Sequence, residues 1–96
     1  MAAYFIVDVE WTDTNARAEY VQGFAPTLAA YGGEVLINAR APEVVEGNWR
    51  PQGAIVVVRF PSIEQARAWY ESDAYRPLCE LRLRGSRSNS LLVEGV

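Results

Sequence analysis

Polar side chains on otherwise apolar, strand-like segments are the first candidates for chemistry in this sequence. Asn38 and Arg40 alternate along the segment 34–41. An amide and a guanidinium projecting from one face of an apolar sheet could orient an anionic ligand or stabilise an enolate. The structural alternative, which we favour, is a buried Asp8–Arg59 pair across the two central strands, with Arg40 solvated at a sheet edge.

Two further combinations place aromatic rings beside arginine. Trp49 and Arg50 are adjacent in a long connection, where stacking and forked hydrogen bonds suit either a ligand or an interface. We favour packing or a dimer contact for this pair. Tyr75 and Arg82 lie two turns apart on one helix face and could line a cleft for an aromatic or carboxylate-bearing molecule. The alternative, which we favour, is an amphipathic helix whose aromatic side chains lie in the core. The candidate binding residues are Asn38, Arg40, Trp49, Arg50, Tyr75 and Arg82.

The composition removes several kinds of chemistry. The chain has no histidine, and all nine basic residues are arginine, which excludes histidine relays and lysine Schiff bases. Cys79 is the single cysteine, so no internal disulfide forms, and without a histidine to activate it we expect a buried, unreactive thiol. Asp8, Glu10 and Asp13 are spread over a strand and a turn, so we expect no metal site. We also expect no cofactor.

Charge and hydropathy also limit the partners. The net charge is −3, and the isoelectric point is about 4.9, which argues against nucleic-acid binding. No apolar run approaches the roughly 20 residues that span a bilayer, and the N-terminal segment lacks the features of a signal peptide. Arginine without lysine suggests a GC-rich bacterial genome. We therefore expect a cytoplasmic bacterial protein that binds neither nucleic acid nor membrane.

These candidate residues must be positioned by strands and helices whose limits the sequence suggests. Pro26 is expected to kink or break the first helix, and Gly32-Gly33 to end it. In the second strand, Val35 and Ile37 are expected on one face and Asn38 and Arg40 on the other. The expected elements are a strand at 3–11, a helix to residue 31, strands at 34–41 and 54–60, helices at 62–70 and 72–85, and a final edge strand at 91–96.

This order predicts one α+β domain over residues 1–96. Two strand–helix–strand halves form the ferredoxin-like βαββαβ arrangement, with the helices on one face of a four-stranded antiparallel sheet. The central strands are apolar on both alternating faces, so a monomer would expose a large apolar patch. We therefore expect a homodimer that packs sheet against sheet.

Several short motifs occur at set positions along the chain, namely Tyr31-Gly32-Gly33, Glu46-Gly47-Asn48-Trp49-Arg50-Pro51, Phe60-Pro61-Ser62, Ala66, Trp69-Tyr70, Ser72, Tyr75 and Arg82. With these residues the chain resembles a known family, the domain-of-unknown-function 1330 family, from Tyr4 to Gly95. The resemblance implies a dimeric α+β barrel, an architecture shared with small antibiotic-biosynthesis monooxygenases and related isomerases and dechlorinases. It implies no reaction, because one fold can support several chemistries.

Three functions remain open on this basis. The first is a homodimeric small-molecule-binding domain with a pocket between sheet and helices, which takes a small anionic or aromatic ligand. The second is a cofactor-independent monooxygenase or isomerase acting on a small aromatic or carboxylate substrate, with a carboxylate, tyrosine or thiol as base. The third is an interaction or structural module. A titratable group in a cleft would favour catalysis, and an apolar pocket closed by Trp49 would favour binding.

Overall fold

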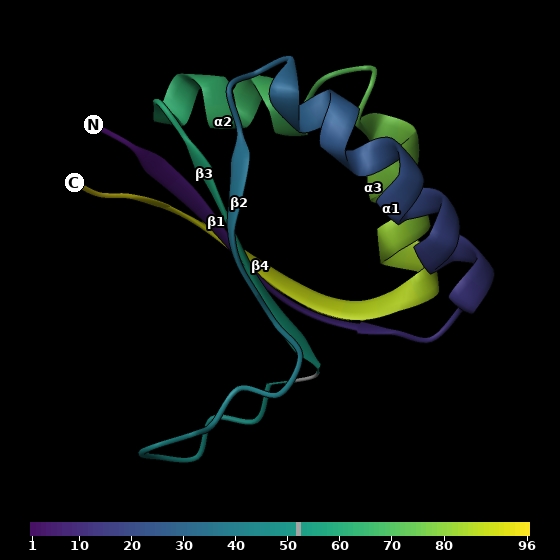
Figure 1. Cartoon of the computed structure of the whole chain (residues 1–96), viewed down its shortest axis with the longest axis vertical. Helices are drawn as coiled ribbons and strands as arrows, with labels where there is room; N and C mark the ends of the chain where they lie inside the picture. The colour runs from purple at the N-terminus through teal and green to yellow at the C-terminus, as the bar shows by residue number, and fades with distance from the viewer. Residues whose placement is uncertain (52) are drawn as a thin grey trace.

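The computed structural model describes residues 1–51 and 53–96. Four strands form one twisted sheet, and three helices cover a single face of it (Figure 1). None of the three helices described has the length and apolar character needed to cross a membrane. In chain order the elements are β1 (Ala3–Trp11), α1 (Thr14–Ala29), β2 (Glu34–Ala39), β3 (Ala54–Phe60), α2 (Ile63–Tyr70), α3 (Arg76–Gly85) and β4 (Ser86–Glu94).

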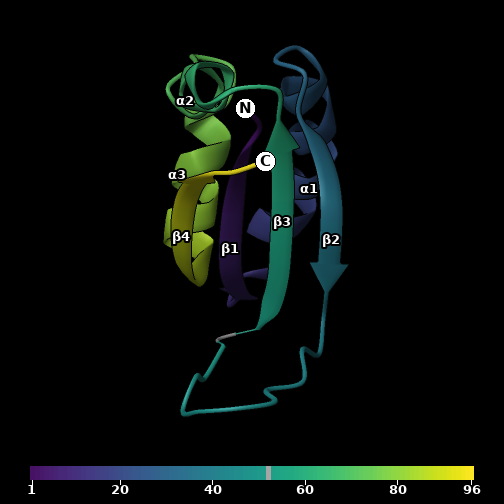
Figure 2. The same ribbon diagram turned by 90° about the vertical axis from the view of Figure 1, so that its left-hand side faces the viewer.

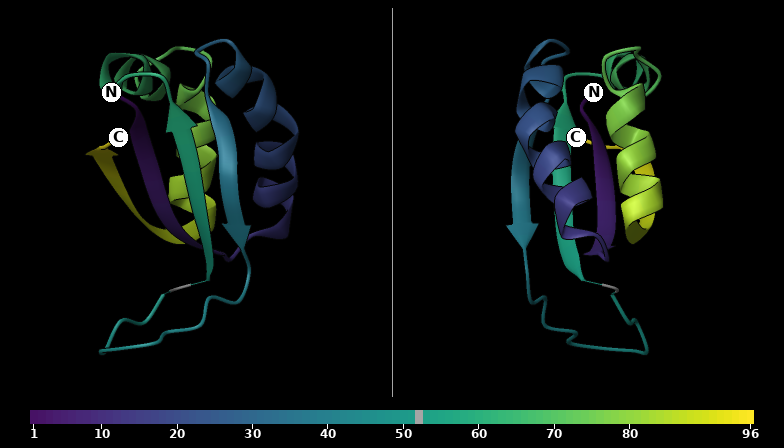
Figure 3. Two further views of the ribbon diagram at one scale, coloured as in Figure 1. Left: turned by 60° about the vertical axis from the view of Figure 1, so that its left-hand side comes forward. Right: turned by 90° about the vertical axis from the view of Figure 1, so that its right-hand side faces the viewer.

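The strand order is β2-β3-β1-β4, and every neighbouring pair is antiparallel. This is the expected ferredoxin-like α+β fold. Seen from the side opposite the helices, the sheet lies uncovered in front of them (Figure 2). The connection after β2, residues 40–51, extends beyond the end of the sheet, while α1 and α3 run along its covered face (Figure 3).

Helix α1 is continuous through Pro26, so the expected break does not occur. Gln22, whose carbonyl loses its helical donor, is exposed like Pro26, so water can satisfy it. Asp13 caps the start of the helix by accepting hydrogen bonds from the backbone N–H groups of Asn15 and Ala16. Beyond the other end, Gly32 adopts a φ of 75°, the left-handed conformation expected for this Gly-Gly pair.

The second half of the chain differs from expectation at two boundaries. Helix α3 begins at Arg76, because Ser72 instead forms a turn in which its hydroxyl accepts from the backbone N–H of Tyr75. Strand β4 begins at Ser86 rather than Leu91, immediately after α3. Its polar first half is strand because it pairs with β1 along its whole length, up to the pairing of Ser86 with Trp11. Backbone pairing thus overrides a polar local sequence.

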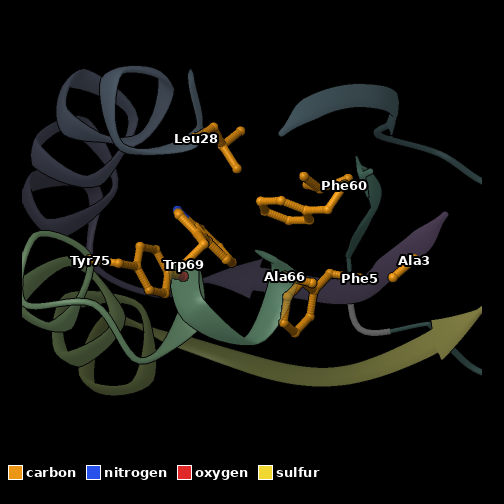
Figure 4. Close-up of a cluster of buried hydrophobic side chains, with 8 residues drawn as sticks. Ala3, Phe5, Leu28, Phe60, Ala66, Trp69 and Tyr75 are labelled. Atoms are coloured by element: carbon orange, nitrogen blue, oxygen red, sulfur yellow. The ribbon is translucent and has the colours of Figure 1, made fainter. Parts of the chain in front are cut away.

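The core lies between the sheet and α2, with rings from several elements in contact (Figure 4). Phe60 is fully buried, and its ring centroid lies 5.3 Å from that of Trp69. Trp69 in turn lies 4.0 Å from Tyr75, measured between ring centroids. This packing fills the end of the sheet under α2. The buried core consists of Ala3, Phe5, Leu28, Val58, Phe60, Ala66, Trp69 and Tyr75.

A β-bulge in β2 reverses the expected alternation of its side chains. Val35 pairs with Val58, but the register shifts, so that Ile37 pairs with Val57. Asn38 then pairs with Val56 on the helix-covered face. Directly paired residues of an antiparallel ladder share a face, so Val35 and Asn38 point the same way, contrary to expectation. No residue type in this segment signals the bulge.

The expected Asp8–Arg59 pair is wrong because of the register. Asp8 lies opposite Ile55, whereas Arg59 lies opposite Tyr4, four positions away along the strand. Arg59 instead forms an ion pair with Glu34 of β2, with 3.6 Å between the guanidinium and the carboxylate. The other part of that structural alternative agrees with the structure, because Arg40 is exposed just past the end of the edge strand β2.

Candidate functional site

A cavity of about 550 Å³ lies between the sheet and helices α1 and α3. Its floor is formed by the helix-facing residues of all four strands. α1 packs mainly against α3 rather than directly on the sheet, which leaves this space between the layers. The lining residues are Phe5, Val7, Val9, Glu10, Trp11, Thr14, Arg17, Tyr20, Val21, Phe24, Val35, Asn38, Arg40, Gly53, Ala54, Val56, Val58, Trp69, Tyr70, Tyr75, Arg82 and Ser90.

The floor of the cavity is apolar in the middle and polar at both edges of the sheet. One row of paired residues crosses all four strands as Asn38, Val56, Val7 and Ser90. All four line the cavity. The amide and the hydroxyl are therefore separated by the width of the two central strands.

The next row repeats this pattern. Ala54 of β3 pairs with Val9 of β1, and Val9 pairs with Ser88 of β4. Ser88 accepts a hydrogen bond of 2.7 Å from the Arg82 guanidinium. Past the end of β2, Arg40 lines the same cavity. Each side of the cavity thus carries an arginine, and valine and alanine lie between them.

Arg82 is the single charged side chain among those buried in the described part of the chain, with 5% of its surface exposed. Its polar neighbours are the Ser88 hydroxyl, the Cys79 sulfur at 3.8 Å and the hydroxyl of Tyr75. Among the described residues, no carboxylate forms an ion pair with it. Burial alone would lower the pKa of this guanidinium, but its interactions with Tyr75 and other neighbours raise it, so Arg82 stays charged.

Two tyrosines adjoin this arginine. The hydroxyls of Tyr20 and Tyr75 lie 2.8 Å apart and share a hydrogen bond. Burial, reinforced by the nearby Tyr75, raises the pKa of Tyr20, so its hydroxyl stays protonated at neutral pH. Tyr20 lies in α1 and was not a candidate binding residue from the sequence, because only the fold brings its hydroxyl to that of Tyr75.

Tyr70 also lines the cavity on this side, and Cys79 lies behind it. The Cys79 thiol lies 3.6 Å from the Tyr70 hydroxyl, and this hydrogen bond, together with burial, raises the pKa of Tyr70. Cys79 is half-buried, somewhat more accessible than the fully buried thiol expected. It contacts Tyr70 and Arg82, which both line the cavity, but it is not itself a lining residue.

The charges around the cavity are predominantly positive although the chain as a whole is acidic. Arg17, Arg40 and Arg82 line it. Glu10 is the one carboxylate residue among the described lining residues, and its side chain is paired with Arg87 at 3.1 Å. An apolar cavity with surplus arginine favours an anionic ligand over a cationic one.

The structure brings four of the six candidate binding residues together around this cavity, namely Asn38, Arg40, Tyr75 and Arg82. Trp49 lies elsewhere, 62% exposed, beside a smaller hollow of about 390 Å³ in the connection. That hollow includes Ala39 and Ile55, which pair with one another on the opposite face of the sheet. Arg50, next to Trp49, is exposed and lines neither space.

Within residues 1–51 and 53–96, no cluster of His, Cys, Asp or Glu could hold a metal ion. The cavity offers arginine, tyrosine, serine and asparagine instead. These groups donate hydrogen bonds to oxygen anions, and Arg82 adds a fixed positive charge. The arrangement can hold a carboxylate or phenolate against an apolar, ring-lined wall.

A ferredoxin-like α+β domain with a cavity between its sheet and its helices is the class of protein that these observations define. Within that class, the chain belongs to the family described as Domain of unknown function (DUF1330), whose model matches residues 2–96. No protein of curated function matches the chain.

Solved structures share this fold at low sequence identity. A protein of unknown function from Rhodopseudomonas palustris superposes with a TM-score of 0.77 at 15% identity, over 99% of this chain and 82% of that one. SnoaB, a cofactor-independent oxygenase from Streptomyces nogalater, gives a TM-score of 0.59 at 15% identity, over 99% of this chain and 93% of that one. A dimeric ferredoxin-like protein from an uncultured marine organism gives 0.58 at 13% identity, over 100% and 95% of the two chains.

Proposed function

We propose that this protein is a homodimeric small-molecule-binding protein whose cavity takes a small anionic aromatic ligand. The observation that carries the proposal is Arg82, a buried cation on the cavity wall whose partners in the described chain are neutral. Burying a charge is costly unless an opposite charge compensates it. A carboxylate or phenolate in the cavity would supply that charge and would accept the hydrogen bonds that the guanidinium can still donate.

The walls suit a flat, apolar ligand body. Tyr20 and Phe24 stack with 5.2 Å between ring centroids, and the ring centroid of Trp11 also lies 5.2 Å from that of Tyr20. Across the cavity, the floor consists of valine and alanine side chains. Rings packed between an aromatic wall and an aliphatic floor would bury apolar surface without leaving polar groups unsatisfied.

The dimer would form through the uncovered face of the sheet. One row of paired residues crosses that face as Ile37, Val57, Ile6 and Leu91, and all four side chains are apolar. Ile37 and Leu91 are 48% and 62% exposed in the single chain. A continuous apolar stripe across a sheet requires a cover, and a second copy supplies a matching one by two-fold symmetry.

A cofactor-independent oxygenase or isomerase is the second candidate. It is supported by the hydrogen-bonded hydroxyls of Tyr20 and Tyr75 beside Arg82, which could stabilise a developing enolate or phenolate. SnoaB shares the fold. Against it, Glu10 is already paired with Arg87, and the raised pKa of Tyr20 makes that phenol a weak acid. We therefore favour binding over catalysis. Consumption of oxygen by the protein in the presence of a bound ligand would instead support catalysis.

Calorimetric titration with 2-naphthoate, compared with the neutral 2-naphthalenemethanol, tests the ligand proposal. We expect the carboxylate to bind at least tenfold more tightly, since a charged hydrogen bond contributes roughly 1.5–3 kcal/mol. Arg82→Met should remove this preference. Arg84→Met is the matched control, because Arg84 lies on the same helix but is exposed and lies outside the cavity lining.

If Arg82→Met does not fold, the comparison between the two probes on the unmodified protein still decides. Equal binding of acid and alcohol, or no binding of either to the folded protein, would refute the proposal. The dimer is tested separately by size-exclusion chromatography with light scattering, where a monomer at micromolar concentration would refute it.

A further inference from the structure

We infer that the cavity takes a ligand with two acidic groups, one at each edge of the sheet, joined by an apolar body. This inference rests on the proposed function, since it assumes that Arg82 holds one anionic group. What it adds is a second anion position at the opposite edge of the sheet. Asn38, in the edge strand β2, and Arg40, the first residue after that strand, form this position.

The two positions are far apart because they belong to the two edge strands. Asn38 lies on β2, and Ser88, which accepts the hydrogen bond from Arg82, lies on β4. The order β2-β3-β1-β4 places three inter-strand steps between them. At about 4.8 Å per step this is roughly 14 Å between the strand backbones, a span that one carboxylate cannot bridge.

The floor between the two positions is apolar in successive rows. Val56 and Val7 separate Asn38 from Ser90, and Ala54 and Val9 continue the same strip of floor. A polar atom placed above this strip would lose its hydration without gaining a hydrogen bond from the floor side chains. The chemistry of the floor therefore requires the middle of the ligand to be apolar and its ends to be polar.

The groups at the β2 edge are available for a ligand. Arg40 forms no ion pair within the described residues, and the Asn38 side chain makes no hydrogen bond to another of them. Both nevertheless line the cavity, because the bulge in β2 turns Asn38 to the helix-covered face. A guanidinium and an amide beside each other suit one carboxylate, which accepts from both.

The charge around the cavity fits a dianion. Three arginines line the space, against one carboxylate residue that Arg87 already pairs. A ligand with a single acidic group would engage Arg82 and leave Arg40 without a counter-charge. A ligand with two acidic groups would place one of them against Arg82 and the other against Arg40.

The test compares naphthalene-2,6-dicarboxylate, whose acidic groups lie at opposite ends of a rigid two-ring body, with 2-naphthoate, which has one. We expect the dicarboxylate to bind about five- to tenfold more tightly to the unmodified protein, the gain of one charged contact at a partly solvated site. Arg40→Met should abolish this preference while 2-naphthoate keeps its affinity. Arg84→Met should preserve both affinities. Arg40 is exposed, so this variant is expected to fold.

The outcomes separate the two proposals. If 2-naphthoate binds through Arg82 and the dicarboxylate binds no more tightly, the two-anion inference is overturned and the proposed function stands. If the dicarboxylate is preferred and Arg40→Met retains that preference, the second anion lies elsewhere and the inference is also overturned. If neither acid binds the folded protein, the proposed function fails, and with it the inference.

Discussion

Val35 and Asn38 point to the same face of the sheet although they are three positions apart, an odd offset that in a regular strand places two side chains on opposite faces. The bulge between Val35 and Ile37 causes this, because it adds one residue to β2 without adding one to β3. Asn38 therefore faces the cavity and Ile37 faces the uncovered side. Two adjacent residues thus serve different surfaces of the molecule.

Substitutions at these two positions should have different effects. Ile37→Asp places a charge in the apolar row of the uncovered face and should shift the protein to monomer while leaving 2-naphthoate binding intact. Asn38→Leu should leave the dimer intact and weaken naphthalene-2,6-dicarboxylate binding by about threefold or more. Light scattering and calorimetric titration on both variants check this. Loss of the dimer in Asn38→Leu, with Ile37→Asp still dimeric, would contradict the assignment of faces.

The hydrogen bond between Tyr20 and Tyr75 should stabilise the fold measurably. Tyr20→Phe removes one hydroxyl and deprives the Tyr75 hydroxyl, on a side chain only 1% exposed, of that partner. We expect the free energy of unfolding to fall by about 1–2 kcal/mol, measured by urea denaturation. Tyr4→Phe is the control, since the Tyr4 hydroxyl bonds the Val96 carbonyl at an exposed position. An equal fall in the free energy of unfolding in both variants would show that the buried hydrogen bond between Tyr20 and Tyr75 stabilises the fold no more than the exposed one of Tyr4 does.

Stability should decline at alkaline pH because of Tyr20. Burial raises the pKa of Tyr20 in the folded protein, whereas in the unfolded chain it titrates near its ordinary value of about 10. Below pH 10 both states keep the proton, and the stabilisation is fully present. Above pH 10 the unfolded chain releases a proton that the folded protein retains, so the free energy of unfolding falls, approaching about 1.4 kcal/mol per pH unit from this group.

Urea midpoints at pH 8, 10 and 11 measure this decline. Tyr20→Phe lacks the titrating group, so its midpoint should fall less steeply between pH 10 and 11 than that of the unmodified protein. Parallel declines in the two proteins would assign the alkaline loss to other groups.

Gly33 should not tolerate a larger residue. A Cβ at this position would lie 2.7 Å from Phe60 Cε1 and 2.9 Å from Leu28 Cδ2, and both side chains are buried in the core. Gly33→Ala is expected to lower the free energy of unfolding by about 1–3 kcal/mol. At Gly95 the nearest contact would be an ordinary 3.4 Å to Tyr4, so Gly95→Ala should be nearly neutral in the same assay. A neutral Gly33→Ala would mean that this part of the core can rearrange.

The sequence predicted the architecture well because its strongest patterns are local. The β-branched runs identified β1 and β3 with their observed limits, and Gly32 adopts the left-handed conformation expected at the end of the first helix. Local signals were insufficient where pairing or solvent decided the outcome. Ser86 is strand because β1 pairs with it, and Pro26 is tolerated because its side of the helix is exposed.

The site was predictable only in part for the same reason. Residue type marked Asn38, Arg40, Tyr75 and Arg82, and the fold brings them to one cavity. Their grouping depends on the bulge in β2, which no residue in that segment announces. The Asp8–Arg59 pair failed because it required a strand register that alternation alone does not provide.

The central claim is that the buried Arg82 binds the acidic group of a ligand in the cavity. The most direct measurement is the ¹⁵N Nε–Hε resonance of Arg82, followed by NMR while 2-naphthoate is added to the protein and assigned with Arg82→Met. We predict a saturable shift of this resonance with no comparable shift for Arg84. Calorimetrically detected binding that leaves the Arg82 resonance unmoved, while shifts are confined to the uncovered face of the sheet, would contradict the claim.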